Sequence, residues 1–389
     1  MKLRIFFSVL LMAVSTVVLS AQTATVLRMT GDKVAVATLP DQDDAVPVTE
    51  GMVLPEGTFV EVGANTKLFM KTFEGAITTA AANTVFAILE VEQVGEQERT
   101  RLRLDQGDLV ASLDPTKRGT HDYGVQTPKG VAAARGTTYS VSVDGFEVMV
   151  TVTDGAVSFE IPELPAPVIL VPGTGSDGTT QEASPLASLM SSASAPAVRA
   201  ALQATAAAVA TLVADTTSGV TNDVLNSVIT AAANAGDATE TTTDGTTTTG
   251  DGGSLVALVA AAATQANADV AQTVVEAAAE ASPATAETVV ASVTREVVDS
   301  DATTDAATVA TTLAAAATTA NAAATVNTAA VTNAVEQSIA AEAAETPAAE
   351  PQPAPAPQPT TETETETEID ESPVEVEVPT DNIVVSPSS

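Results

Sequence analysis

The sequence predicts an all-β N-terminal domain, followed by short helices rich in alanine and threonine and by a disordered acidic tail. Between residues 22 and 162, apolar and polar residues alternate in roughly ten short runs separated by turn residues, as in a sandwich, a roll or a short β-helix. From residue 186 to 345 alanine dominates, and alanine is the strongest helix former. Residues 346–389 are rich in Pro, Thr and Glu and contain no basic residue, a composition typical of disorder.

Composition limits what the chain can be. Its 389 residues are enough for two or three domains, but aromatic residues make up only 3% and tryptophan is absent, which argues against one large core. The formal net charge of −35 disfavours nucleic acid and anionic lipid as partners and leaves cations and basic partners open. Because the chain has no cysteine, disulfides, thiolate catalysis and cysteine-ligated metal sites are excluded.

Residues 1–21 have the features of a secretory signal peptide. Lys2 and Arg4 precede an apolar run over residues 5–19, and Ser20 and Ala21 supply the small residues of a cleavage site. The alternative is an uncleaved anchor, but the run is shorter than the ~20 residues that a spanning helix needs. No other segment is expected to span a membrane, so the sequence predicts a chain without an integral span after cleavage, located in the periplasm, outside the cell or at its surface.

The predicted β domain, residues 22–162, is most regular between residues 126 and 143. Pro128 and Gly130 indicate a turn, and Gly136 stands where a positive φ would be costly for any other residue. From residue 137 to 143, Thr, Tyr and Val alternate with Thr and Ser, the pattern of a half-buried strand. Asp144 and Gly145 then turn the chain into a second alternating strand.

This stretch resembles the signature of the FecR-like domain, with a Thr-Pro turn and an Arg-Gly-Thr segment that leads into a strand with an aromatic residue. A strand that ends in glycine lies about 20 residues before the turn, as in that family. The matching positions, to which the resemblance assigns a structural role, are Gly107, Thr127, Pro128, Arg135, Gly136, Thr137 and Tyr139.

The resemblance covers about a third of the chain. Signalling members of the family follow a cytoplasmic anti-sigma segment and one transmembrane helix, and they relay a siderophore-transport signal to a sigma factor. Because the signal peptide starts at Met1, we expect a secreted member that lacks the cytoplasmic segment.

Beyond the β domain, residues 163–185 are predicted to be a Pro- and Gly-rich linker. In residues 186–345, units that resemble each other, such as 223–229 and 269–275, predict irregular repeats of one short helix and a turn. The repeats could stack as a small solenoid, and isolated fluctuating helices or coil are the alternative. Residues 239–253, rich in Thr, Gly and Asp, predict a flexible interruption.

Few residues are candidates for chemistry. His121, the single histidine, precedes Asp122, but neighbours on a strand point to opposite faces, so we expect a strand-end histidine and no catalytic pair. An acidic loop could ligate Ca²⁺ but has the composition of a solvated turn; it contains Asp41, Asp43 and Asp44.

Basic residues offer two further candidate surfaces. Arg135 could contact an anionic ligand, although an arginine beside a turn more often holds carbonyls or a carboxylate in place. Arg99, Arg101 and Arg103 lie on one face of a predicted strand, and Lys117 and Arg118 form a second basic pair. A site for sugar or an anionic polymer is one interpretation, and a solvated sheet face is the favoured one.

We therefore expect a secreted or periplasmic, non-enzymatic FecR-like protein that binds or scaffolds a component of the cell envelope. No catalytic residue, cofactor or metal site is predicted, and the partner is an unknown protein or envelope component rather than nucleic acid. Envelope signal transduction related to siderophore sensing and sigma-factor regulation is one alternative. A surface adhesin or matrix protein is the other.

Overall fold

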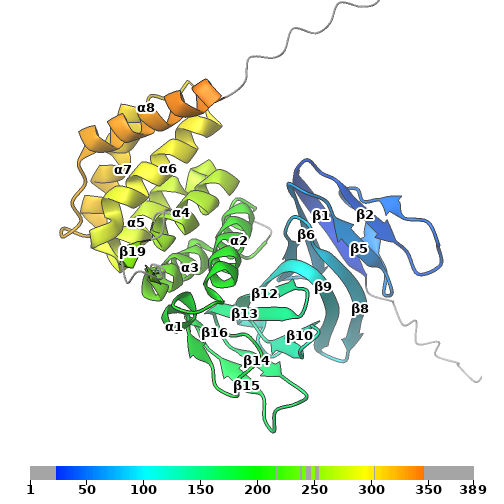
Figure 1. Cartoon of the computed structure of the whole chain (residues 1–389). Helices are drawn as coiled ribbons and strands as arrows, with labels where there is room; N and C mark the ends of the chain where they lie inside the picture. Colours follow the sequence, from blue (N-terminus) through cyan, green and yellow to red (C-terminus); the bar gives the residue numbers. More distant parts are fainter. Residues whose placement is uncertain are drawn as a thin grey trace, which may run out of the picture. The chain divides into compact units, whose positions relative to one another are not determined.

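The computed structural model describes residues 23–215, 218–236, 239–241, 247–249, 254–301 and 303–345 (Figure 1). The predicted signal peptide, 1–21, and the predicted acidic tail, 346–389, lie outside these residues. Within them, the predicted order is confirmed, since a large β domain is followed by a series of helices.

The β domain consists of two sheets that share one long strand, β9 (Gln97–Leu113). Sheet A runs in the order β4 (Val53–Leu54), β1 (Ala24–Gly31), β6 (Thr66–Phe73), β7 (Ala76–Ala80), the C-terminal part of β9, β12 (Thr138–Asp144), β13 (Glu147–Asp154), β16 (Thr174–Ser176) and β17 (Ser184–Pro185). Sheet B runs in the order β3 (Val46–Pro47), β2 (Ala35–Thr38), β5 (Phe59–Val62), β8 (Val85–Val94), the N-terminal part of β9, β10 (His121–Gln126), β11 (Val131–Ala134), β14 (Val157–Glu160) and β15 (Val168–Leu170). The pairs are antiparallel except β9 with β10, which is parallel.

Strand β9 passes from one sheet to the other at Gly107. Residues before Gly107 pair with β8 and β10 in sheet B, and residues from Gly107 onward pair with β12 and β7 in sheet A. Gly107 has a φ of +88°, and a Cβ there would lie 2.5 Å from Thr84 Oγ1 and 2.6 Å from Thr84 Cα. Both the backbone angle and the close approach of Thr84 therefore require glycine.

The core lies between the facing sheets and is centred on two buried tyrosines. Tyr123 of sheet B and Tyr139 of sheet A meet edge to face, with ring centroids 6.4 Å apart. The Tyr123 hydroxyl bonds with the Thr78 hydroxyl of sheet A, and the Tyr139 hydroxyl donates to the Ala132 carbonyl of sheet B at 3.4 Å. Both polar ends are thus satisfied across the sandwich, as buried tyrosines require.

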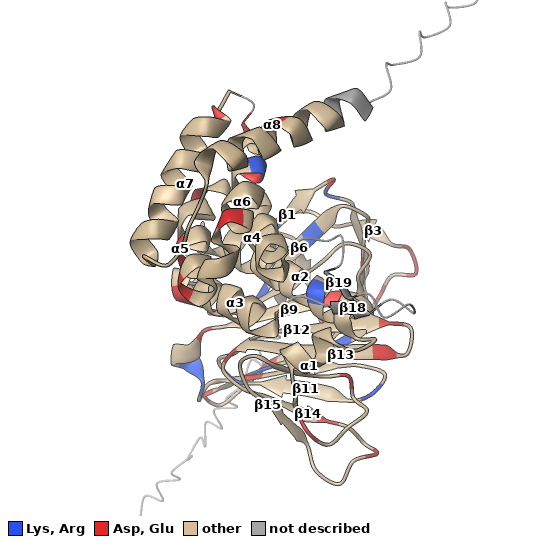
Figure 2. Cartoon of the chain, turned by 60° about the vertical axis from the view of Figure 1, so that its left-hand side comes forward, with Lys and Arg blue, Asp and Glu red and all other residues tan. Residues whose placement is uncertain are grey.

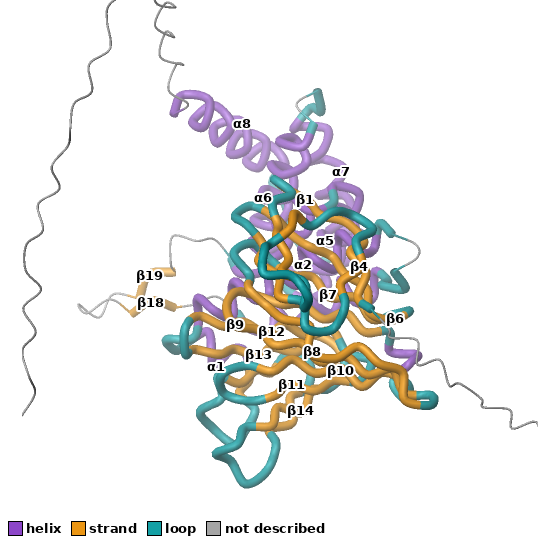
Figure 3. Tube along the Cα trace, turned by 90° about the vertical axis from the view of Figure 1, so that its right-hand side faces the viewer, coloured by secondary structure: helices purple, strands orange, loops and turns teal. Residues whose placement is uncertain are grey.

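The helical region, purple in Figure 3, has a hydrophobic core of its own. Its helices are α1 (Leu186–Met190), α2 (Ala195–Val213), α3 (Asn222–Ala235), α4 (Leu255–Ala266), α5 (Ala271–Ala281), α6 (Ala286–Ser300), α7 (Ala306–Ala320) and α8 (Thr328–Glu345). Helices α2, α4 and α6 pack side by side in one row, and α3, α5 and α7 in a second row against it. The alternative of isolated helices or coil does not describe this region.

Two asparagines join helices of this array at equivalent places. Asn267, which follows α4, donates through Nδ2 to the Ala210 carbonyl near the end of α2 at 3.0 Å. Asn321, which follows α7, donates in the same way to the Ala279 carbonyl near the end of α5 at 3.1 Å. Each bond satisfies a carbonyl in the last turns of a neighbouring helix, where carbonyls lack helical partners.

Residues 163–185 are not a separate linker, because β15, β16 and β17 extend the two sheets within this segment. Val168 and Leu170 are buried in the core between the sheets, although prolines and glycines surround them in the sequence. The predicted interruption at 239–253 contains a short hairpin of β18 (Thr239–Thr241) and β19 (Thr247–Thr249), and its other residues lie outside the described ranges.

Helix α2 differs from the sequence prediction in two respects, its apolar length and the strand face that it covers. By length and composition alone it could cross a membrane, with 19 residues and a mean hydropathy of 1.3, although no span was expected beyond the signal peptide. In the fold it is a core helix, packed against α3, α4 and strands of sheet A. It also covers the Ser and Thr face of β12, so that Ser140 is 1% exposed and residues 138–141 of the strand are buried on both faces.

We predict that Gly107→Ala lowers the free energy of unfolding by about 3 kcal/mol, because it combines backbone strain with a clash against Thr84. Gly95→Ala is the matched control: Gly95 has a φ of +65° in open space, so only the strain of about 1 kcal/mol is expected. Denaturant unfolding of both variants measures the difference. Equal losses would show that the Thr84 contact does not fix the bend.

Candidate functional site

The Thr-Pro turn of the motif is closed by hydrogen bonds of a threonine side chain. Thr127 Oγ1 accepts from the backbone N–H groups of Lys129 and Gly130, at 3.3 Å and 3.2 Å, and donates to the Gly130 carbonyl at 3.0 Å. A Cβ on Gly130 would lie 2.2 Å from the Glu160 carbonyl of β14. The exposed Pro128 therefore sits on a turn that holds β10, β11 and β14 together.

The Arg-Gly-Thr segment connects β11 to β12, and, like the Thr-Pro turn, it is fixed by a threonine hydroxyl and a closely packed glycine. Gly136 has a φ of +61°, and a Cβ there would lie 2.3 Å from Arg118 Cγ. Thr137 Oγ1 donates to the Ala156 carbonyl at 3.0 Å and accepts from the Ala156 N–H at 3.3 Å. The Arg135 side chain is exposed and forms no ion pair within 4 Å among the described residues, while its carbonyl accepts from Thr137 at 3.3 Å.

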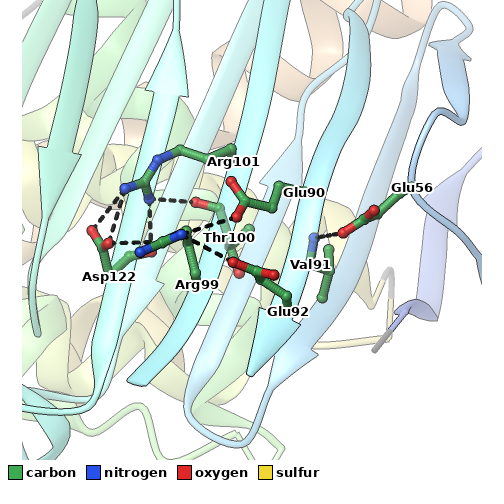
Figure 4. A network of polar contacts seen from close by, with 8 residues as sticks. All are labelled: Glu56, Glu90, Val91, Glu92, Arg99, Thr100, Arg101 and Asp122. Atoms are coloured by element: carbon green, nitrogen blue, oxygen red, sulfur yellow. Dashed lines mark hydrogen bonds and ion pairs between the residues drawn. The ribbon is translucent and has the colours of Figure 1, made fainter. Parts of the chain in front are cut away.

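The row of arginines on β9 forms a polar network on the outer face of sheet B (Figure 4). Arg101 Nη2 donates to both carboxylate oxygens of Asp122 at 2.9 Å, and its Nη1 donates to the Asp122 carbonyl at 2.8 Å. Its side chain lies across Gly124, where a Cβ would be 3.0 Å from Arg101 Cδ.

Arg99 extends the network to β8. Its Nε donates to Asp122 at 3.3 Å, and its Nη1 donates to Glu90 and Glu92 at 3.2 Å and 2.9 Å. Arg103 pairs with Asp105 at 3.0 Å. The arginines are thus neutralised by carboxylates on their own sheet, which agrees with a structural face more than with a site for an anionic polymer.

His121 and Asp122 point to opposite faces of β10, as strand alternation predicts. His121 is the first residue of β10 and is buried, with Nε2 2.9 Å from Glu98 Oε2 and 3.2 Å from the Glu74 carbonyl. Lys117 Nζ donates to the same carbonyl at 2.6 Å, whereas Arg118 is exposed beside Gly136. The basic pair is therefore split between two environments.

The acidic loop after β2, which the sequence indicates is a solvated turn, is exposed. Its three aspartates, Asp41, Asp43 and Asp44, are exposed in the loop after β2. Across the described ranges, no group of three or more His, Asp or Glu side chains could hold a metal ion.

A cavity of about 670 Å³ lies where the β9 bend, the β12–β13 hairpin and the start of α2 meet. Its walls combine Gly107 and Asp108 after the bend, Val148 of β13, and Ala197 and Ala200 of α2. Further lining includes Lys129, Ser142, Asp144, Glu147 and Asp177. Sequence patterns cannot indicate this cavity, because its walls come from distant segments.

Asp108 is the most unusual group of the cavity. Burial raises the pKa of its carboxyl group, and Asp144 raises it further, while a hydrogen bond from Ser142 acts in the opposite direction. Its Oδ1 is buried without a hydrogen-bond partner. Lys129, which also lines the cavity, donates through Nζ to the Asp177 carbonyl at 2.8 Å and forms no ion pair with Asp108. The cavity can therefore receive a ligand with both apolar and cationic or donor groups.

The fold and the motif define a two-sheet β domain in which threonine hydrogen bonds and glycines fix the turns. Residues 48–158 match the family model described as FecR protein, so the chain carries a FecR domain. A search of curated proteins gives no match.

Two crystal structures of a candidate anti-sigma factor from Parabacteroides distasonis ATCC 8503 are similar to part of the chain, with 15% and 16% identity and a TM-score of 0.27 in each case. Each match covers 32% of this chain and 57% of that chain.

We predict opposite pH effects for two aspartates. Burial is the largest single influence on the pKa of the Asp122 carboxyl group, and it raises that pKa. The hydrogen bond and charge of Arg101, together with Arg99, outweigh burial, so the pKa is lowered. Asp122→Asn therefore costs about 2 kcal/mol at pH 7, and this loss shrinks as pH falls below the usual carboxyl range near 4.

Asp108 has a raised pKa, so Asp108→Asn stabilises the fold at pH 7, and the gain disappears as pH falls through the folded-state pKa. Unfolding free energies of both variants between pH 3 and 7 test the signs. Asp105→Asn, at an exposed pair, is the control and should change stability by less than about 1 kcal/mol. A loss for Asp108→Asn at pH 7 would contradict the prediction.

Proposed function

We propose that this chain is a secreted or periplasmic, non-enzymatic protein that binds or scaffolds a component of the cell envelope. The observation that carries the proposal is the composite cavity, which exists because the helical array packs on the FecR domain. Its volume falls in the range of about 300–1,000 Å³ that ligand sites have. Apolar residues of α2 and β13 face polar groups of β9 and the hairpin, a combination that supports recognition.

Charge supports a particular kind of partner. The chain carries a net charge of −35, and four acidic residues line the cavity beside one lysine: Asp108, Asp144, Glu147 and Asp177. A field of this sign accelerates association with cationic groups and repels polyanions. We therefore favour a basic protein or envelope component over nucleic acid.

Envelope signal transduction related to siderophore sensing is the second candidate, and the FecR match over residues 48–158 favours it. In this case, deletion of the chain in its host should change transcription of iron-uptake genes under iron limitation, and the full chain should restore the response. Unchanged transcription in the deletion strain would leave the binding role as the better proposal.

Fractionation of the native host tests the location. A mature chain that starts near Gln22 and is recovered from the periplasm or the surface is the expected result. An intact Met1 held in the inner membrane would show that residues 5–19 are an anchor, and would favour signalling over a secreted module.

Photo-crosslinking tests the cavity in the full chain. We predict that a benzoylphenylalanine at Ala200, which is exposed and lines the cavity, gives crosslinks to an envelope component in living cells. The same probe at Ala187, exposed on α1 outside the cavity, is the matched control and should give none. Equal crosslinking from both positions, or from neither, would remove the cavity as the binding site.

A further inference from the structure

The outer face of sheet A is covered by the helical array. Helix α2 packs over β9, β12 and β13, and α3 packs over β13 (Figure 1). The covered side chains alternate with those that face the core, and each is at most 3% exposed: Phe69, Ile77, Thr79, Val110, Ser112, Ser140, Met149 and Thr151. Half of this set carries hydroxyl groups, which is unusual for a face buried against helices.

The hydroxyls of this face are only partly satisfied. Ser140 and Thr151 bond to each other at 2.6 Å. Thr79 Oγ1 and Ser112 Oγ are buried and have no hydrogen-bond partner. Water would bind both groups if the helices were absent, so their burial opposes docking of the array.

On the core-facing side of sheet A, the hydroxyl groups of Thr78 and Thr72 are hydrogen-bonded. Thr78, the neighbour of Thr79, points inward and bonds to the Tyr123 hydroxyl. Thr72 accepts a hydrogen bond from Thr100 of sheet B at 3.0 Å. Sheet A is therefore held more firmly to sheet B than to the helices.

Among the contacts that hold the array on sheet A, specific ones lie near both ends of α2. At its C-terminal end, Leu212 joins Phe69 and Ile77 in a small apolar cluster. Arg28 Nη2 donates to the Thr211 carbonyl at 2.9 Å and lies over the Phe69 ring at 5.2 Å. Toward the other end, Met149 of β13 enters the core of the helical array.

We propose that the helical array is a reversible cover of sheet A, which lifts from the sheet while both parts stay folded. Each part has its own core, so separation exposes the hydroxyl-rich face without breaking the sandwich or the helix packing. The opened state gives the FecR domain a second surface, and the cavity at the start of α2 opens with it. The proposal concerns a motion of the chain and does not depend on the identity of a ligand.

The absence of cysteine makes the motion measurable, because a single engineered thiol is an unambiguous reporter. Ser112→Cys places it under the helices, and Ala111→Cys places it in the core between the sheets, one residue away on β9. Both are used in the full chain, at increasing denaturant below the unfolding transition, with a thiol-reactive dye.

The expected result is that Ser112→Cys reacts at least about tenfold faster than Ala111→Cys, with a weaker dependence on denaturant, because local opening exposes less surface than unfolding. Thr79→Cys should behave like Ser112→Cys, and Val141→Cys should behave like Ala111→Cys. Circular dichroism identifies any variant that fails to fold. Equal rates and equal denaturant dependence for the two faces would overturn the proposal.

A second substitution tests whether the unpaired hydroxyls weaken the docking of the helical array on sheet A. Adding Thr79→Val to Ser112→Cys removes an unpaired buried hydroxyl at similar volume, so docking should strengthen and labelling should slow by about tenfold. Thr78→Val is the matched control, because it removes a satisfied hydroxyl and should not slow labelling. Faster labelling with Thr79→Val would show that this hydroxyl supports docking, contrary to the proposal.

Discussion

The bend of β9 at Gly107 is the constraint on which the architecture depends. Before the bend, the strand presents Arg99 and Arg101 to the outer network of sheet B; after it, Ala111 faces the core and Ser112 faces the helices. A strand without this bend would continue one sheet and leave the other without its centre. The same bend also places Asp108 in the cavity wall, so the candidate site depends on the bend that joins the two sheets.

Much of the fold follows from local pattern. The alternation from Thr137 to Val143, the separation of His121 from Asp122, and the glycine at position 136 were all predictable, because strand period and positive φ depend on near neighbours. Helices between residues 186 and 345 follow from alanine content. The parallel pairing of β9 with β10 was not predictable, since register between distant strands depends on the whole core.

The covering of sheet A shows why other features were missed. Alternation identifies two faces of a strand, but it does not say what lies against the polar one. Serine and threonine are small, and the alanines of α2 are small, so α2 can pack closely on this face of the sheet. Likewise, Val168 and Leu170 are too few to stand out among prolines, although they complete the core. The cavity depends on both features, because Asp177 follows β16 and Ala197 and Ala200 belong to α2. Figure 2 shows the charged residues around these elements.

The two-row helical array has a consequence for the length of the helical region. Each helix of a row contacts the next, and Asn267 and Asn321 join neighbours through equivalent bonds. Gain or loss of one helix pair would therefore lengthen or shorten the array by about 10 Å, the usual distance between packed helices, without altering either sheet. The length of the array is in this sense independent of the two sheets.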